Sequence, residues 1–170
     1  MVYALVYYPK IDVRCINQFR RKYDPQVDLI APHITLMFPV PQLIARGNLV
    51  HHIDSVLRNW RSFPIHLQGL YKSRDSYLFL TVQEGSADIV SLHDEIYRGM
   101  LADYQREDIP FIPHITLGEF SKDENQYLRA LEEARELNLD YHCVIDKLHL
   151  VEINDDRSQI VGSKEFSLPM

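Results

Sequence analysis

The feature that most constrains this chain is a pentapeptide that occurs twice. Pro-His-Ile-Thr-Leu stands at Pro32–Leu36 and again at Pro113–Leu117, 81 residues apart. Each copy opens an apolar, β-branched run, which predicts a β-strand. Because the side chains of a strand alternate between its two faces, the His and the Thr of each copy are expected on one face. Each copy therefore sets an imidazole beside a hydroxyl on a strand whose other face is apolar.

Four residues are the candidates for chemistry: His33 and Thr35 in the first copy, His114 and Thr116 in the second. Two imidazoles that face one cleft suit acid–base chemistry, because histidine titrates near pH ~6.5. One ring can take a proton from a nucleophile while the other gives one to a leaving group. The hydroxyls can donate hydrogen bonds to the oxygens of a tetrahedral anion. A phosphodiester fits this set, and a strained cyclic phosphate needs no metal.

The apolar pattern of each half reads strand, helix, motif strand, helix, strand, and a final extra strand follows. The expected strands cover 2–8, 33–40, 65–71, 77–83, 114–120, 141–153 and 159–168, and the expected helices cover 11–23, 47–60, 87–106 and 125–137. The last two strands read as a hairpin. This duplication predicts an α/β (α+β) fold with two pseudo-symmetric β-α-β-α-β lobes.

We expect these lobes to form one bilobal domain, residues 1–170, with lobe-forming repeats at about 1–72 and 76–170. Two related lobes around an approximate two-fold axis would bring both motif strands to a central cleft. Antiparallel or mixed sheets would face that cleft. The repeat follows from the sequence, whereas the axis is an inference from it.

Composition predicts a reduced, cytoplasmic enzyme. No stretch approaches the ~18–20 apolar residues that a membrane span needs, and the apolar N-terminus reads as a first strand and not as a signal peptide. Cys15 and Cys143 stand in unrelated contexts, which argues against a disulfide framework or a metal knuckle. The net charge of −6 argues against a broad nucleic-acid-binding surface.

The charge is unevenly distributed. Residues 1–85 hold 10 Lys/Arg and 6 Asp/Glu, whereas residues 86–170 hold 8 and 18. One interpretation is that solvated helix faces simply differ. The other is that the N-terminal half guides an anionic substrate, in which case basic residues matter there, such as Lys10, Arg20, Arg21 and Lys22.

The chain resembles the 2H phosphoesterase superfamily, in particular its 2'-5' RNA ligase-like proteins. Their mark is a pair of His-x-Thr/Ser-hydrophobic motifs in a bilobal α/β fold, and the resemblance covers the whole chain in length, element order and motif position. It implies that His33 and His114 are the catalytic acid/base pair, and that Thr35 and Thr116 bind phosphate. Members open cyclic phosphates, cleave or join 2'-5' linkages, or trim RNA ends. We expect no cofactor and no metal.

One departure bears on the substrate. Some RNA-acting members have an Arg shortly after the second motif, where this chain has Gly118 and Glu119. Strand alternation predicts that Gly118 shares the catalytic face and that Glu119 points away from it or sits at the end of the strand. The missing cation favours a small nucleotide or a cyclic phosphate over long RNA.

Two alternatives stay open: a 2'-5' RNA ligase or RNA end-processing enzyme that acts on long RNA, and a non-catalytic nucleotide- or RNA-binding module. The two His residues disfavour the second, because a pure binder is better served by Arg or Lys. The pattern also leaves open the oligomeric state, the bond cleaved, and which His is the acid.

Other residues are weaker candidates. Three cations could contact substrate: Lys10, Lys72 and Arg74. Three tyrosines could stack on a base: Tyr7, Tyr8 and Tyr71. Four further histidines are scattered along the chain and are interpreted as surface or strand residues: His66, His93, His142 and His149. A zinc site on the two motif histidines would lack a third ligand at suitable spacing.

Overall fold

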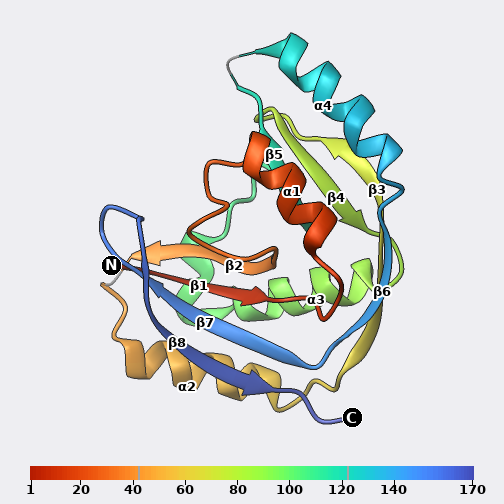
Figure 1. The fold of residues 1–170 in the computed structure, drawn as a ribbon. Coiled ribbons are helices and arrows are strands. Elements are labelled where there is room, and N and C mark those ends of the chain that lie inside the picture. The colour runs from red at the N-terminus through yellow and green to blue at the C-terminus, as the bar shows by residue number, and fades with distance from the viewer. Residues whose placement is uncertain (42, 122) are drawn as a thin grey trace.

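The computed structural model of the chain describes residues 1–41, 43–121 and 123–170. Within these ranges, eight strands form one antiparallel sheet with helices packed against it (Figure 1). The strands are β1 (Val2–Tyr7), β2 (Ile34–Pro41), β3 (Phe63–Lys72), β4 (Tyr77–Val82), β5 (His114–Glu119), β6 (Asp140–Ile145), β7 (Lys147–Ile153) and β8 (Ile160–Ser167). The helices are α1 (Arg14–Tyr23), α2 (Arg46–Leu57), α3 (Ser86–Ile96), the short 3₁₀ helix η1 (Gly99–Tyr104) and α4 (Glu124–Glu136).

The two motif strands lie side by side at the centre of the sheet. The strand order is β6-β3-β4-β5-β2-β1-β7-β8, and β5 meets β2 through the antiparallel pair Ile34 and Ile115. On either side of this junction lies a four-stranded half, and the sheet curls between them (Figure 1). The expected α+β fold with two antiparallel halves is confirmed.

The halves of the sheet interleave the two halves of the sequence. Strand β3 belongs to the first repeat but pairs with β4 and β6 of the second. Strands β7 and β8, at the end of the chain, extend the half that holds β1 and β2. Helix α1 packs against β5, and α3 packs against β2, so each motif strand is backed by a helix from the other repeat (Figure 1).

The motif strands show the expected alternation. Ile34 and Leu36 of β2 are fully buried, as are Ile115 and Leu117 of β5. The His and Thr residues between them are only partly buried and face the other side. The apolar side chains anchor both strands in the core, which fixes the direction of the polar ones.

The expected strand 141–153 is wrong as one element, because it is two strands. Strand β6 pairs with β3 at one edge of the sheet, whereas β7 pairs with β1 in the other half. The apolar alternation slips by one residue between Ile145 and Leu148, and Asp146 stands at the break. The hairpin of the last two strands, β7 and β8, is confirmed.

The expected helix 87–106 is also wrong as one element. Helix α3 ends at Ile96, and the chain continues as η1 from Gly99. Gly99 has a φ of +69°, a left-handed conformation that interrupts a right-handed helix. The expected helices 11–23 and 47–60 are shorter than the apolar pattern suggested, at 14–23 and 46–57. In the described residues, no helix is both long and apolar enough to cross a membrane.

Candidate active site

One cleft brings together the four side chains that the repeated motif singles out. His33, Thr35, His114 and Thr116 all line a pocket of about 650 Å³ over the junction of β2 and β5. Its other walls come from the segments that precede the two motif strands and from the turn between β3 and β4. The volume lies in the ~300–1,000 Å³ range of small-molecule sites.

The strand register sets the geometry of the four groups. The pair of Ile34 and Ile115, continued by one residue in each direction, sets His33 against Thr116 and Thr35 against His114. The two imidazoles thus occupy diagonal positions, whose Cα atoms lie roughly 7–8 Å apart. In this continued register, each histidine stands opposite the other motif's threonine. This arrangement is suited to hold one tetrahedral anion from opposite sides.

Both rings are held by the same backbone device. The Nδ1 of His33 lies 2.9 Å from the carbonyl oxygen of Ala31, and the Nδ1 of His114 lies 2.5 Å from that of Ile112. A carbonyl only accepts, so Nδ1 carries the proton and donates it. The proline between the two partners restricts the carbonyl residue to extended backbone. In each neutral ring, Nε2 therefore keeps the lone pair that can accept a proton.

The surroundings lower the pKa of both rings, and different neighbours contribute to each. Burial, with a smaller contribution from the nearby His33, lowers the pKa of His114 to about 4, against the opposing effect of the Ile112 carbonyl. Burial also lowers the pKa of His33, and Arg20 adds to this, whereas the Ala31 carbonyl and the Asp24 carboxylate partly offset it. Both rings are therefore neutral near pH 7.

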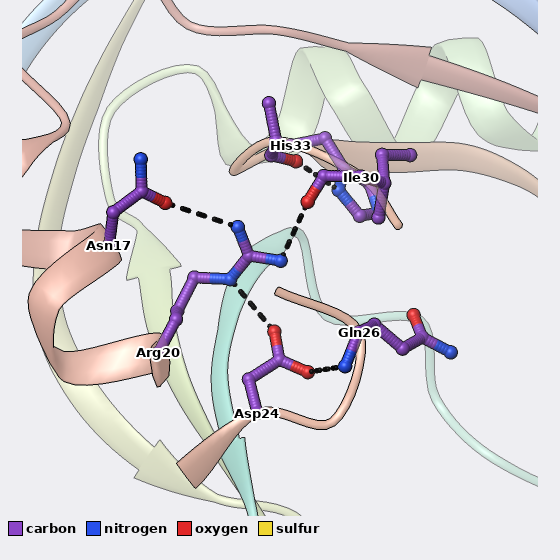
Figure 2. A network of polar contacts seen from close by, with 7 residues as sticks. Asn17, Arg20, Asp24, Gln26, Ile30 and His33 are labelled. Carbon is purple, nitrogen blue, oxygen red and sulfur yellow. Dashed lines mark hydrogen bonds and ion pairs between the residues drawn. The ribbon is translucent and has the colours of Figure 1, made fainter. Parts of the chain in front are cut away.

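A buried ion pair fixes the loop that leads to His33 (Figure 2). The Arg20 guanidinium donates through Nε to Asp24, 2.8 Å away, and through Nη2 to the carbonyl oxygen of Ile30, also 2.8 Å away. Asp24 in turn accepts from the backbone N–H of Gln26 at 2.9 Å. Both charged side chains are nearly inaccessible to solvent. The sequence suggested that Arg20 attracts substrate, but its donors here hold the 24–30 loop.

Aromatic side chains form the support and one wall of the cleft. The ring of Phe79 stacks on His114, with centroids 3.4 Å apart and planes 13° apart. On the other side, Phe38 meets Phe111 edge-on, and Phe111 stacks on His93 at 3.8 Å. His93 is not the surface or strand residue that the sequence suggested: it is buried in α3 and bonds the Leu36 carbonyl through Nδ1.

Glu119 is the last residue of β5, as one of the two expectations had it, but the expectation that it points away from the cleft is wrong, because a β-bulge reverses its direction. Thr116 pairs with Phe79, but Gly118 pairs with Leu78 and Glu119 with Tyr77, so one extra residue of β5 lies between these pairs. Both Leu117 and Gly118 are buried as a result, and Glu119 lines the cleft. A Cβ on Gly118 would lie 2.8 Å from the Tyr23 side chain, so this packing requires glycine.

The weaker candidates for substrate contact differ in whether they line the cleft. Tyr71 and Arg74 line the cleft. Tyr7 does not, since it is buried and its hydroxyl donates to the Val144 carbonyl at 2.9 Å. Tyr8 packs edge-on against both His33 and His149.

Two of the three candidate cations are engaged in ion pairs. Lys10 pairs with Asp146 at 2.5 Å, and Lys72 pairs with Glu124 at 2.8 Å. Neither belongs to the cleft lining that the described residues form. Of the three, Arg74 is therefore the cation placed to meet a substrate.

Sequence reasoning missed the aromatic support and the buried ion pair. Phe79 lies 35 residues before His114 in the chain, and only the pairing of β4 with β5 brings the rings together. The Arg20–Asp24 spacing of four residues was visible as a helical i, i+4 pair, but its burial was not.

Comparison with known proteins agrees with this fold and motif arrangement. The sequence model of the 2'-5' RNA ligase superfamily matches residues 7–157. A provisionally named phosphoesterase of Bacillus licheniformis is 26% identical over 167 residues, which are 95% of each chain. Crystal structures of Escherichia coli LigT resemble the fold: the complex with NADP+ has a TM-score of 0.62 at 18% identity, and that with 3'-AMP 0.60 at 17%. Each alignment covers 99% of this chain and 98% of LigT.

A bilobal antiparallel sheet with paired His-x-Thr strands at its centre defines a class of phosphoesterase-like folds. This chain belongs to the 2'-5' RNA ligase superfamily, and the resemblance that the two motifs predicted is confirmed.

Proposed function

We propose that this protein is a metal-independent phosphoesterase that opens a cyclic phosphodiester, such as a 2',3'-cyclic nucleotide, or cleaves a 2'-5'-linked nucleotide. The observation that carries the proposal is the diagonal placement of two Nδ1-anchored imidazoles in one cleft, each across from a threonine hydroxyl. His33 and His114 transfer the protons, while Thr35 and Thr116 hold the two non-bridging oxygens. Water attacks phosphorus in line with the departing ribose oxygen.

We assign the two roles from the different surroundings of the two rings. His114 acts as the general base, because burial favours its neutral ring and lowers its pKa to about 4. His33 acts as the general acid, because Asp24 offsets part of the same effect there. The bound phosphate is itself an anion, and an anion beside an imidazole raises its pKa, so His33 holds its proton in the complex.

The cleft favours a small nucleotide over long RNA. Its volume suits one nucleotide, and its aromatic wall of Phe38 and Phe111 offers a surface on which a base can stack. Tight binding of long RNA needs a groove with cations spaced along the backbone. Here the chain carries a net charge of −6. The cleft lining mixes the carboxylates of Asp24, Asp75 and Glu119 with the guanidinium groups of Arg20, Arg74, Arg106 and Arg157, and Arg20 is engaged by Asp24.

The test is a panel of substrates: 2',3'-cyclic nucleotides, 3',5'-cyclic nucleotides and 2'-5' dinucleotides. Each is incubated with wild type, His33→Ala, His114→Ala, Thr35→Val and Thr116→Val. We expect turnover of a cyclic or 2'-5' substrate that survives EDTA, a loss of roughly 10²–10⁴-fold for each His variant, and about 10²–10³-fold for each Thr variant. Phosphorus NMR of the product identifies the bond that breaks.

A binding module makes the opposite prediction. It would bind nucleotides with measurable affinity and turn over no member of the panel. An enzyme of long RNA would act on oligonucleotides with a steep dependence on salt and leave the mononucleotides unchanged. Either result would refute the proposal.

A further inference from the structure

A second group of histidines lies together at one edge of the sheet. His66 of β3 and His142 of β6 are direct partners in the antiparallel register, and their rings stack with centroids 4.0 Å apart. Asp140, two residues before His142, lies on the same face of β6. Its Oδ1 is 2.6 Å from the Nε2 of His66 and 3.9 Å from the Nε2 of His142.

We propose that His66, Asp140 and His142 form a binding site for a borderline divalent transition-metal ion such as Zn²⁺. Among the described residues, these three offer ligand atoms that all lie within 4.8 Å of one another. Two ligands at tetrahedral positions about Zn²⁺ lie ~3.4 Å apart, given metal–ligand distances of ~2.1 Å. The two distances from Asp140 bracket this value.

The donor set is that of a metal site with an open position. Two imidazole nitrogens and one carboxylate oxygen suit Zn²⁺ and its transition-metal neighbours, whereas Ca²⁺ and Mg²⁺ prefer oxygen ligands. Three protein ligands leave room for solvent as the fourth. An ion must lie in the plane of each ring that binds it, so the stacked rings must tilt apart. His142 is free to do so, since its side chain is 71% exposed.

The carboxylate is oriented from behind. Gln68 is the direct partner of Asp140 in the register and donates from Nε2 to its second oxygen, Oδ2, at 3.2 Å. An outer hydrogen bond of this kind holds a ligand in place, and its loss typically costs 10–100-fold in metal affinity. Gln68 therefore provides a test that does not remove a ligand.

The site is separate from the catalytic cleft. A row of neighbours crosses the sheet from His114 to Thr81 and, through the Thr81 hydroxyl, to the backbone of Gln68, which pairs with Asp140. Three strand spacings of ~4.8 Å place the two sites roughly 14 Å apart. Strand β6 is the last strand of the sheet at this edge, so a bound ion would link this edge strand to its neighbour β3.

The experiment is a calorimetric titration with Zn²⁺ in a Cys15→Ser background, because Cys15 is an exposed thiol. We expect one ion per chain, and a loss of at least about 100-fold in affinity for His66→Ala and for His142→Ala, since even an outer partner costs 10–100-fold. Gln68→Ala should lose about 10-fold. Zn²⁺ should also raise the melting temperature of the parent and not of the ligand variants.

Two controls guard the interpretation. His51→Ala removes an exposed helix histidine and should bind as the parent does. The double variant His33→Ala/His114→Ala removes the catalytic pair and should also retain the ion. The proposal is overturned if affinity and stoichiometry persist in His142→Ala, if binding vanishes only with the catalytic pair, or if no binding occurs up to roughly 1 mM Zn²⁺.

Discussion

Ile34 of β2 and Ile115 of β5 face each other at the junction of the two halves of the sheet. Both side chains are buried, so the pair is anchored in the core. One residue further along each strand, the same register places each histidine against the other motif's threonine. The identical pentapeptides thus generate one site with approximate two-fold symmetry, and their surroundings then make the two histidines unequal.

The pH dependence follows from these unequal histidines. The base must be deprotonated, so kcat/KM should rise as pH increases through about 4, the pKa of His114. The acid must be protonated, so kcat/KM should fall as pH increases through the pKa of His33, which lies below the ordinary 6.5. We expect a bell with its optimum between about pH 4 and 6.5, measured with a cyclic nucleotide. An optimum above pH 7 would contradict the depressed values.

The assignment of acid and base has its own test. A phosphodiester with a p-nitrophenyl leaving group needs no proton on departure, because the phenolate is a stable anion. The activity deficit of His33→Ala should therefore shrink by at least about 10²-fold on this substrate, which is the lower end of the rate enhancement that a general acid usually contributes. The deficit of His114→Ala should persist. Rescue of His114→Ala instead would reverse the two roles.

Arg20 should matter for stability more than its surface counterparts do. Arg20→Ala leaves the buried Asp24 carboxylate without its partner, which typically costs 3–5 kcal/mol. The matched control is Arg58→Ala, which breaks the exposed i, i+4 pair with Asp54 and should cost at most about 0.5 kcal/mol. Urea denaturation measures both. Equal losses would mean that burial of the Arg20 pair is irrelevant.

Glu119 should limit the binding of longer nucleic acid. Glu119→Gln removes one negative charge from the cleft lining at nearly constant size. A like charge at 4 Å costs ~1 kcal/mol in water, so oligonucleotide affinity at low salt should rise about fivefold. Glu132→Gln on the exposed face of α4 provides the control and should have no comparable effect. An unchanged affinity in Glu119→Gln would show that the carboxylate does not meet the nucleic acid backbone.

The sequence predicted the parts of the fold that local patterns encode. The duplicated pentapeptide revealed both motif strands and, through alternation, the shared face of His33 and Thr35. It did not reveal the bulge at Leu117 and Gly118, because nothing in a strand pattern marks one extra residue. That single residue is why Glu119 lies in the cleft and not behind it.

The sequence also could not predict which distant strands pair with each other. His66 and His142 are 76 residues apart in the chain and looked scattered. Only the pairing of β3 with β6 makes them neighbours. The same reason hid the division of 141–153, whose two parts join opposite halves of the sheet.

The most direct measurement is the turnover of a 2',3'-cyclic nucleotide by wild type, His33→Ala and His114→Ala, with circular dichroism and nucleotide binding recorded for each. The account predicts that both variants fold and bind nucleotide, and that each loses roughly 10²–10⁴-fold in kcat. Near-normal turnover in either folded variant would show that the paired imidazoles do not perform the chemistry.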